Sequence, residues 1–124
     1  MSTTYSYGDY KLMNWKKGDF GIPRFSNTNI SLYRDGSQIG AGILIADNEL
    51  LGMKIIPTDK GHGTAFLELL IRRAKSLGKT IFKVDSVTGL GSDTKEINEN
   101  RKKMEHILKK MRFAQKRNHW ELTI

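Results

Sequence analysis

Residues 50–64 read LLGMKIIPTDKGHGT, and this stretch decides the fold class. It begins with an apolar run of strand length, Leu50 to Ile56, which is followed by a turn with glycines at Gly61 and Gly63. From Thr64 to Leu77 the apolar residues recur at spacings of three and four, which is typical of an amphipathic helix. The stretch therefore predicts a strand, a glycine-rich turn and a helix in succession.

The segments before this stretch predict an antiparallel meander. Ile30 to Tyr33 alternates as a strand does, and Asp35-Gly36 is a strong hairpin signal because both turn positions need a positive φ. Ile39 to Ala46 is a second strand, and Asp47-Asn48 is a second tight turn into Leu50 to Ile56.

The segments after it return the chain to the same sheet. Thr80 to Val84 is a further strand, so strand, helix and strand imply a right-handed parallel crossover. A second helix is expected from Glu96 to Met111, and Phe113 to Lys116 with Trp120 to Thr123 predict a final hairpin. We therefore expect an α+β chain with a mixed, mostly antiparallel sheet and a central helix crossover.

We expect residues 1–124 to form a single domain, in which residues 1–29 are a divergent N-terminal strand and loop. Tyr10 to Trp15 is the candidate strand, and Lys16 to Asn29 is broken by glycine and proline. There is no cysteine, which excludes disulfides, thiolate zinc sites and a cysteine nucleophile. No secretory signal or membrane-length apolar run is visible, so we expect a cytoplasmic location and no membrane partner. The histidines lack metal-ligand spacing, and no metal site is expected.

The glycine-rich turn before the first helix has two interpretations. A helix N-terminus carries unpaired N–H groups and a partial positive charge, so Gly61 and Gly63 would let a phosphate approach the backbone, and Lys60 adds a cation. The alternative is a simple tight connection. The sequence is neither a Walker loop nor a dinucleotide fingerprint.

From Ile30 to Ile124 the order of elements resembles the GNAT N-acetyltransferase superfamily, a family of acetyl-CoA-dependent enzymes. In that family a Gln/Arg-x-x-Gly-x-Gly/Ala loop joins the fourth strand to a long helix, and Thr58 to Gly63 occupies that loop here. Lys110-Met111-Arg112-Phe113 is similar to the Lys-Leu-Gly-Phe entry into the family's last hairpin.

The resemblance implies a GNAT-like acyl-CoA N-acyltransferase fold and acetyl-CoA as the cofactor. It implies that the backbone of a strand would pair with the pantetheine arm and that the loop and helix start would hold the pyrophosphate. A primary amine would attack the thioester between two diverging strands. The cofactor-binding residues so implied are Met53, Lys54, Ile55, Lys60, Gly61, His62, Gly63, Thr64 and Asn100.

Three departures from the family pattern stand beside this resemblance. Thr58 replaces the usual Gln or Arg, and Leu108 occupies the position of a tyrosine that protonates the leaving thiolate in many members. The asparagine often near the cofactor aligns with Arg101, one residue from Asn100.

The catalytic candidates are Glu49, Asp85 and Ser86. Glu49 or Asp85 would act as the base for the amine, and Ser86 as a proton donor. A solvated turn carboxylate and a loop-capping aspartate are the alternatives for the two acids. His62 would act as a general base, contact phosphate or simply point to solvent. His119 is expected to be solvated in the last turn.

The net charge is +8, and a cationic stripe runs along the second helix and beyond it. This stripe is either a solvated face or a surface for the cofactor's phosphates, nucleic acid or an acidic protein. The resemblance implies an N-acetyltransferase acting on a small-molecule or protein amine. The alternative is a non-catalytic GNAT-like module that binds nucleic acid or an acidic partner through its basic C-terminal helix. A homodimer is compatible with the family, and nucleic acid is the less favoured partner.

Overall fold

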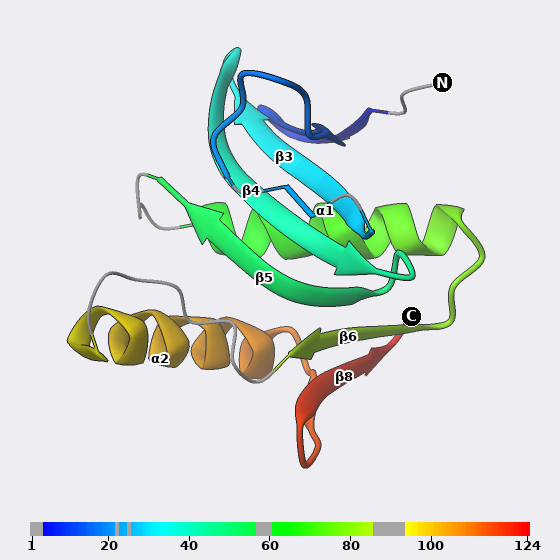
Figure 1. Cartoon of the computed structure of the whole chain (residues 1–124). Helices are drawn as coiled ribbons and strands as arrows, with labels where there is room; N and C mark the ends of the chain where they lie inside the picture. Colours follow the sequence, from blue (N-terminus) through cyan, green and yellow to red (C-terminus); the bar gives the residue numbers. More distant parts are fainter. Residues whose placement is uncertain (1–3, 22, 25, 57–60, 86–93) are drawn as a thin grey trace.

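The computed structural model describes residues 4–21, 23–24, 26–56, 61–85 and 94–124, with the backbone alone at positions 94, 96, 97 and 100. Eight strands form one sheet in the order β1-β2-β3-β4-β5-β6-β8-β7. Its strands are β1 (Tyr5–Tyr7), β2 (Tyr10–Asn14), β3 (Thr28–Arg34), β4 (Ser37–Ile45), β5 (Glu49–Ile55), β6 (Ile81–Asp85), β7 (Ala114–Gln115) and β8 (His119–Thr123). The helices are α1 (His62–Ser76), which crosses behind β3 to β5, and α2 (Thr94–Lys110), which lies beside β6 (Figure 1).

The predicted mixed sheet is confirmed. All neighbouring strands are antiparallel except β5 and β6, which are parallel and joined through α1. The β3–β4 turn is as predicted, since Asp35 and Gly36 have φ values of 51° and 82°. The β4–β5 turn lies one residue earlier than predicted, because the positive φ values belong to Ala46 and Asp47.

Helix α1 packs closely on β4 because two strand residues have no side chain. A Cβ atom at Gly40 would lie 2.9 Å from Cε2 of Phe66, and one at Gly42 would lie 3.2 Å from its Cζ. Phe66 is fully buried, as are most of the apolar residues that predicted the helix. The buried face of α1 and the inner face of the sheet therefore form one continuous core.

The C-terminal elements are close to their predicted ranges. Met104 and Leu108 of α2 are buried, and Arg112 ends the helix with a φ of 67°, while Phe113 N–H donates to the Leu108 carbonyl at 2.9 Å. Phe113 then packs edge to face on Phe82 of β6, with the ring centroids 6.4 Å apart. The final hairpin is shorter on its first strand than predicted, since β7 has two residues.

The segment between β2 and β3 contains no helix or strand among its described residues, as predicted, and a polar network ties it to the sheet. Asp19 accepts hydrogen bonds from the hydroxyl of Tyr33, from Ser31 Oγ at 2.8 Å and from the Lys16 N–H at 3.0 Å. Burial raises the pKa of Asp19, but these hydrogen bonds outweigh it and the net pKa is lowered. Burial and the Asp19 contact raise the pKa of Tyr33 to about 12.

Candidate functional site

Strand β5 has two neighbours at its beginning and one at its end. It pairs with β6 only where Glu49 lies opposite Lys83 and Leu50 opposite Val84. Its pairing with β4 continues to Ile55. Figure 1 shows β5 and β6 close together at one end and diverging toward their arrowheads.

A β-bulge marks the point where the two strands diverge. Leu50 lies opposite Leu44 and Gly52 opposite Ile43, so Leu51 is an extra residue in β5. A bulge bends its strand and increases the local twist. We attribute the divergence of Met53 and Ile55 from β6 to this extra residue.

The diverging end of β5 presents backbone groups away from β4. Ile56 N–H donates to the Ile39 carbonyl at 2.8 Å, so the N–H groups of Ile56 and Lys54 face β4. Because polar groups alternate along a strand, those of Met53 and Ile55 face the other way. No strand in the described part of the chain pairs with this edge. Of the three residues predicted to pair with pantetheine, Met53 and Ile55 therefore direct their backbone groups away from β4. The third, Lys54, has an exposed side chain.

The first turn of α1 lies beside this edge, since a Cβ atom at Gly63 would be 3.8 Å from Cδ1 of Ile55. Gly61 precedes the helix with a φ of 95°, which favours glycine. Among the described residues no side chain caps this terminus, and the first turn of α1 carries no acidic residue. No carboxylate of the helix's own first turn offsets its dipole, and N–H groups such as that of Thr64 have no acceptor within the helix. Lys60, predicted to add a cation here, lies outside the described residues.

The side chain of His62 is buried, 3 % exposed, rather than directed to solvent. Its Nδ1 is hydrogen-bonded to the Tyr10 hydroxyl at 2.7 Å, and the two rings meet edge to face. The guanidinium of Arg34 lies over the other ring of this pair, 4.9 Å from the Tyr10 centroid. The imidazole thus connects the start of α1 to β2. The backbone of His62 belongs to the turn and helix start that are predicted to hold the pyrophosphate.

Gly63 also permits the close approach of the two helices. A Cβ atom there would lie 2.8 Å from Cδ1 of Ile107 on α2. The sequence suggests that Gly63→Val would block phosphate and leave the fold intact. The structure shows that this substitution would also displace Ile107, so it does not test cofactor binding cleanly.

The two carboxylate candidates lie on one face of the sheet. Glu49 is opposite Lys83 in β6, and Asp85 is two residues further along that strand, level with the bulge. Glu121 of β8 is also opposite Lys83, and His119 is opposite Asp85.

His119 and Glu121 were not among the predicted site residues. His119 begins β8 and is half-buried, with Nε2 3.2 Å from Oε1 of Glu121, so the expectation of a solvated turn was wrong. The register of β8 against β6 places them here, and no local sequence pattern gives that register. Ser86 lies outside the described residues.

On α2, Leu108 is 1 % exposed and belongs to the core. Its aliphatic side chain has no proton to donate to a leaving thiolate. Arg101 has a buried Nε atom that has no hydrogen-bond partner among the described residues. Asn100 lies in the helix, and its side chain is outside the described set.

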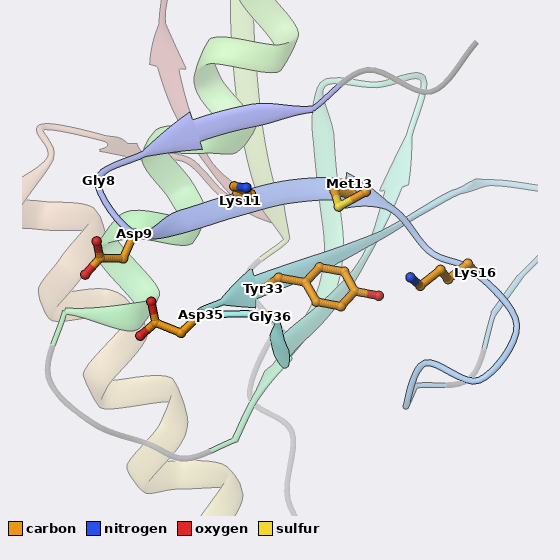
Figure 2. Close-up of a pocket in the computed structure, with 8 residues that line it drawn as sticks. All are labelled: Gly8, Asp9, Lys11, Met13, Lys16, Tyr33, Asp35 and Gly36. Atoms are coloured by element: carbon orange, nitrogen blue, oxygen red, sulfur yellow. The ribbon is translucent and has the colours of Figure 1, made fainter.

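An open pocket of about 510 Å³ lies elsewhere, on β2, β3 and the turns beside them. Figure 2 shows the carboxylates of Asp9 and Asp35 at one end, Lys16 at the other, and Met13 and Tyr33 between them. None of its lining residues belongs to β5, β6 or α1. The candidate functional site is the β5 edge, because backbone groups without a described strand partner, a helix N-terminus and ionisable side chains lie together there.

Two kinds of feature are not found in the described residues. No group of three or more His, Asp or Glu side chains could hold a metal ion. Neither α1 nor α2 has the length and apolar character that crossing a membrane requires.

An antiparallel meander, a helix crossover to a diverging parallel strand and a terminal hairpin define a GNAT-like fold. A GCN5-related N-acetyltransferase from Rhodopseudomonas palustris superposes with a TM-score of 0.57 at 15% identity, over 81% of this chain and 63% of that one. The Campylobacter jejuni N-acetyltransferase PseH gives a TM-score of 0.50 at 16% identity, over 79% and 68% of the two chains. The chain thus spans just under two thirds of the first of these structures. No family model and no curated protein matches the sequence.

Proposed function

We propose that this protein binds acetyl-CoA along the open edge of β5 and at the start of α1, and transfers the acetyl group to a primary amine. The observation that carries the proposal is the divergence of β5 from β6 at the Leu51 bulge, with the N-terminus of α1, which no described side chain caps, beside the open edge. The N-acetyltransferases that share this fold support the same class of reaction.

The residues present fit such a ligand. The outward N–H and carbonyl groups of Met53 and Ile55 match the amides of a pantetheine arm as an added strand would. The first turn of α1 matches a pyrophosphate, because its N–H groups and dipole favour an anion. The buried, unpartnered Nε of Arg101 is a further donor on the helix that contacts α1.

Acetyl-CoA supplies a thioester, whose C–S bond breaks as the amine nitrogen bonds to the carbonyl carbon. The thiolate leaves, and the amine must lose a proton. We assign the proton acceptor to Asp85, because it ends β6 level with the bulge where the strands separate. His119 is opposite Asp85 and hydrogen-bonded to Glu121, and we assign to it the onward relay of this proton.

Calorimetric titration with acetyl-CoA, together with thermal unfolding, tests the binding step. A specific ligand at a hundredfold excess over its Kd should stabilise the fold by about 2.7 kcal/mol. Absence of heat and of a thermal shift at millimolar acetyl-CoA would overturn the proposal.

Release of the free thiol in the presence of a panel of amines tests the transfer step. Asp85→Asn should lower kcat by about 10²- to 10⁴-fold and leave acetyl-CoA affinity unchanged. Glu49→Gln is the matched control, since Glu49 lies on the same face but at the paired end of β5. Binding without thiol release for any amine, or equal losses in the two variants, would refute the assigned chemistry.

A further inference from the structure

The positive charge of the chain is concentrated in its C-terminal fifth. Between residues 94 and 118 the sequence has nine lysines and arginines and three acids, out of 21 and 13 in the whole chain. Eight of these cations are exposed, and we call them together the basic face. Its members are Lys95, Lys102, Lys103, Lys109, Lys110, Arg112, Lys116 and Arg117.

Helix geometry aligns the lysines of α2 on one side. Lys95, Lys102 and Lys109 are successively seven residues apart, so they form a line about 21 Å long at a rise of about 1.5 Å per residue. Lys103 and Lys110 form a second line beside it. Met104 and Leu108 hold the opposite side of α2 in the core, so the lysines project from a fixed support.

No cation of the basic face forms an ion pair with a described side chain. The ion pairs of the described residues join Arg34 to Asp9, Arg73 to Asp47 and His119 to Glu121, and none of them involves a cation of the basic face. With nine lysines and arginines against three acids, the segment keeps a net positive charge that attracts a polyanion.

The chemistry of the face favours one class of polyanion. The exposed large apolar side chains of the described chain are Tyr7, Ile56 and Leu77, all outside the basic face. Without an exposed aromatic ring it offers no stacking platform for single-stranded bases. Without an exposed apolar stripe it offers nothing to insert into a bilayer, because the apolar side of α2 is already buried. Lysines are point charges suited to phosphate oxygens.

We propose that the basic face binds the phosphate backbone of double-stranded nucleic acid without sequence preference. A line of about 21 Å spans about six phosphates of one strand, at about 3.4 Å of axis per phosphate. The inference does not rest on acetyl transfer, since the basic face excludes the residues proposed for acetyl-CoA.

Fluorescence anisotropy with a labelled 20-base-pair duplex of mixed sequence tests the inference. Four phosphate contacts predict a slope of log K against log salt of about −3.6, so affinity should fall on the order of 100-fold between 50 and 200 mM NaCl. A duplex of shuffled sequence should bind within about threefold. Salt-independent or undetectable binding at 50 mM salt would overturn the proposal.

A matched pair of double variants separates the basic face from net charge. Lys102→Gln with Lys109→Gln should make the slope about 1.8 less negative and weaken binding at least tenfold at 0.1 M salt. Lys17→Gln with Lys75→Gln removes the same charge from exposed positions elsewhere and should change affinity less than twofold. Equal losses in the two variants would mean that net charge alone is responsible.

Two further experiments identify the partner class and separate this proposal from acetyl-CoA binding. If poly-glutamate or phosphatidylserine vesicles bind as tightly as the duplex, with the same dependence on Lys102 and Lys109, the proposal of nucleic acid is overturned. The partner would then be an acidic protein or a membrane surface, respectively. Titration of acetyl-CoA into the Lys102→Gln/Lys109→Gln variant should give the wild-type affinity. A failure of duplex binding with intact acetyl-CoA binding therefore overturns this proposal alone.

Discussion

The two ends of β5 have the same strand geometry but different surroundings. At the paired end, Leu50 is fully buried between β4 and β6. The turn before it is also fixed, since the Asn48 side chain donates to the Ile81 carbonyl at 3.0 Å and the Asn48 carbonyl accepts from Lys83 at 2.8 Å. At the open end, Met53 and Ile55 have β4 on one edge and α1 behind. One extra residue at the bulge therefore separates a structural end from the end at which we propose that acetyl-CoA binds.

The largest expected difference between the two ends is in amide hydrogen exchange. The N–H groups of Gly52 and Lys54 face β4 and should exchange only when the sheet opens. Those of Met53 and Ile55 face the open edge and should exchange at least 10³-fold faster in the ligand-free protein, because global opening requires about 5 kcal/mol or more. Acetyl-CoA should selectively slow the amide hydrogen exchange of Met53 and Ile55, which two-dimensional NMR in D₂O would measure.

The Leu50 amide at the paired end is the internal control, and acetyl-CoA should affect it much less. Protection of Met53 and Ile55 equal to that of Lys54 without ligand would mean that the edge is already covered. That result would remove the proposed acyl-CoA site while leaving the fold unaffected.

The sequence predicted the fold well because its signals were local. Asp35-Gly36 marked a turn, and the apolar spacing from 64 to 77 marked α1, which begins two residues earlier than expected. The β5–β6 divergence was predicted only through the resemblance, because a bulge depends on the register between two strands. Leu51 has no feature in the sequence that identifies it as the extra residue.

The candidate site was less predictable for a similar reason. The burial of His62 depends on Tyr10, 52 positions away along the chain. His119 faces Asp85 through the pairing of β6 with β8, which sequence periodicity does not specify. Local patterns identify elements, whereas long-range contacts decide which side chains meet.

A smaller effect is expected from disturbing the support behind the open end. Gly40 lies opposite Ile55, and an alanine Cβ there would be 2.9 Å from the Phe66 ring and 3.2 Å from Cβ of Leu32. Gly40→Ala should therefore lower the free energy of unfolding by about 1–3 kcal/mol, which is the usual range for overpacking. Urea denaturation at constant m-value would measure it.

Gly52→Ala is the control for that substitution. Gly52 is also a strand glycine, but no atom of the described residues lies within 4 Å of a Cβ atom built on it. We expect a change within about 0.5 kcal/mol, as for surface substitutions. Equal destabilisation by the two alanines would mean that α1 does not hold the open end through Phe66.

The smallest effect on stability is expected from removing the charge of Asp47, which lies beside the paired end of β5. Asp47, in the β4–β5 turn, accepts from Arg73 Nη1 at 3.0 Å and from Thr28 Oγ1 at 3.1 Å. Burial raises the pKa of Asp47, but the Arg73 and Thr28 hydrogen bonds outweigh it and hold the pKa below 3.8. Because the pKa is lower in the folded than in the unfolded protein, the ionised carboxylate stabilises the fold at pH values above the unfolded-state pKa. This stabilisation is lost as the pH falls through the folded-state pKa.

Asp47→Asn should therefore reduce stability by about 0.2–1 kcal/mol at pH 7, since the carboxylate is partly exposed and solvent screens the pair. Asparagine tolerates the positive φ of 64° at this position, so the substitution isolates the charge. The difference from wild type should shrink as pH falls below 3.8 and should decrease in high salt. Asp9→Asn, at an ion pair of 3.8 Å whose acid is 66 % exposed, is the matched control and should have no measurable effect. A pH-independent loss in Asp47→Asn would show that the hydrogen-bond geometry of the turn, and not its charge, fixes the paired end of β5.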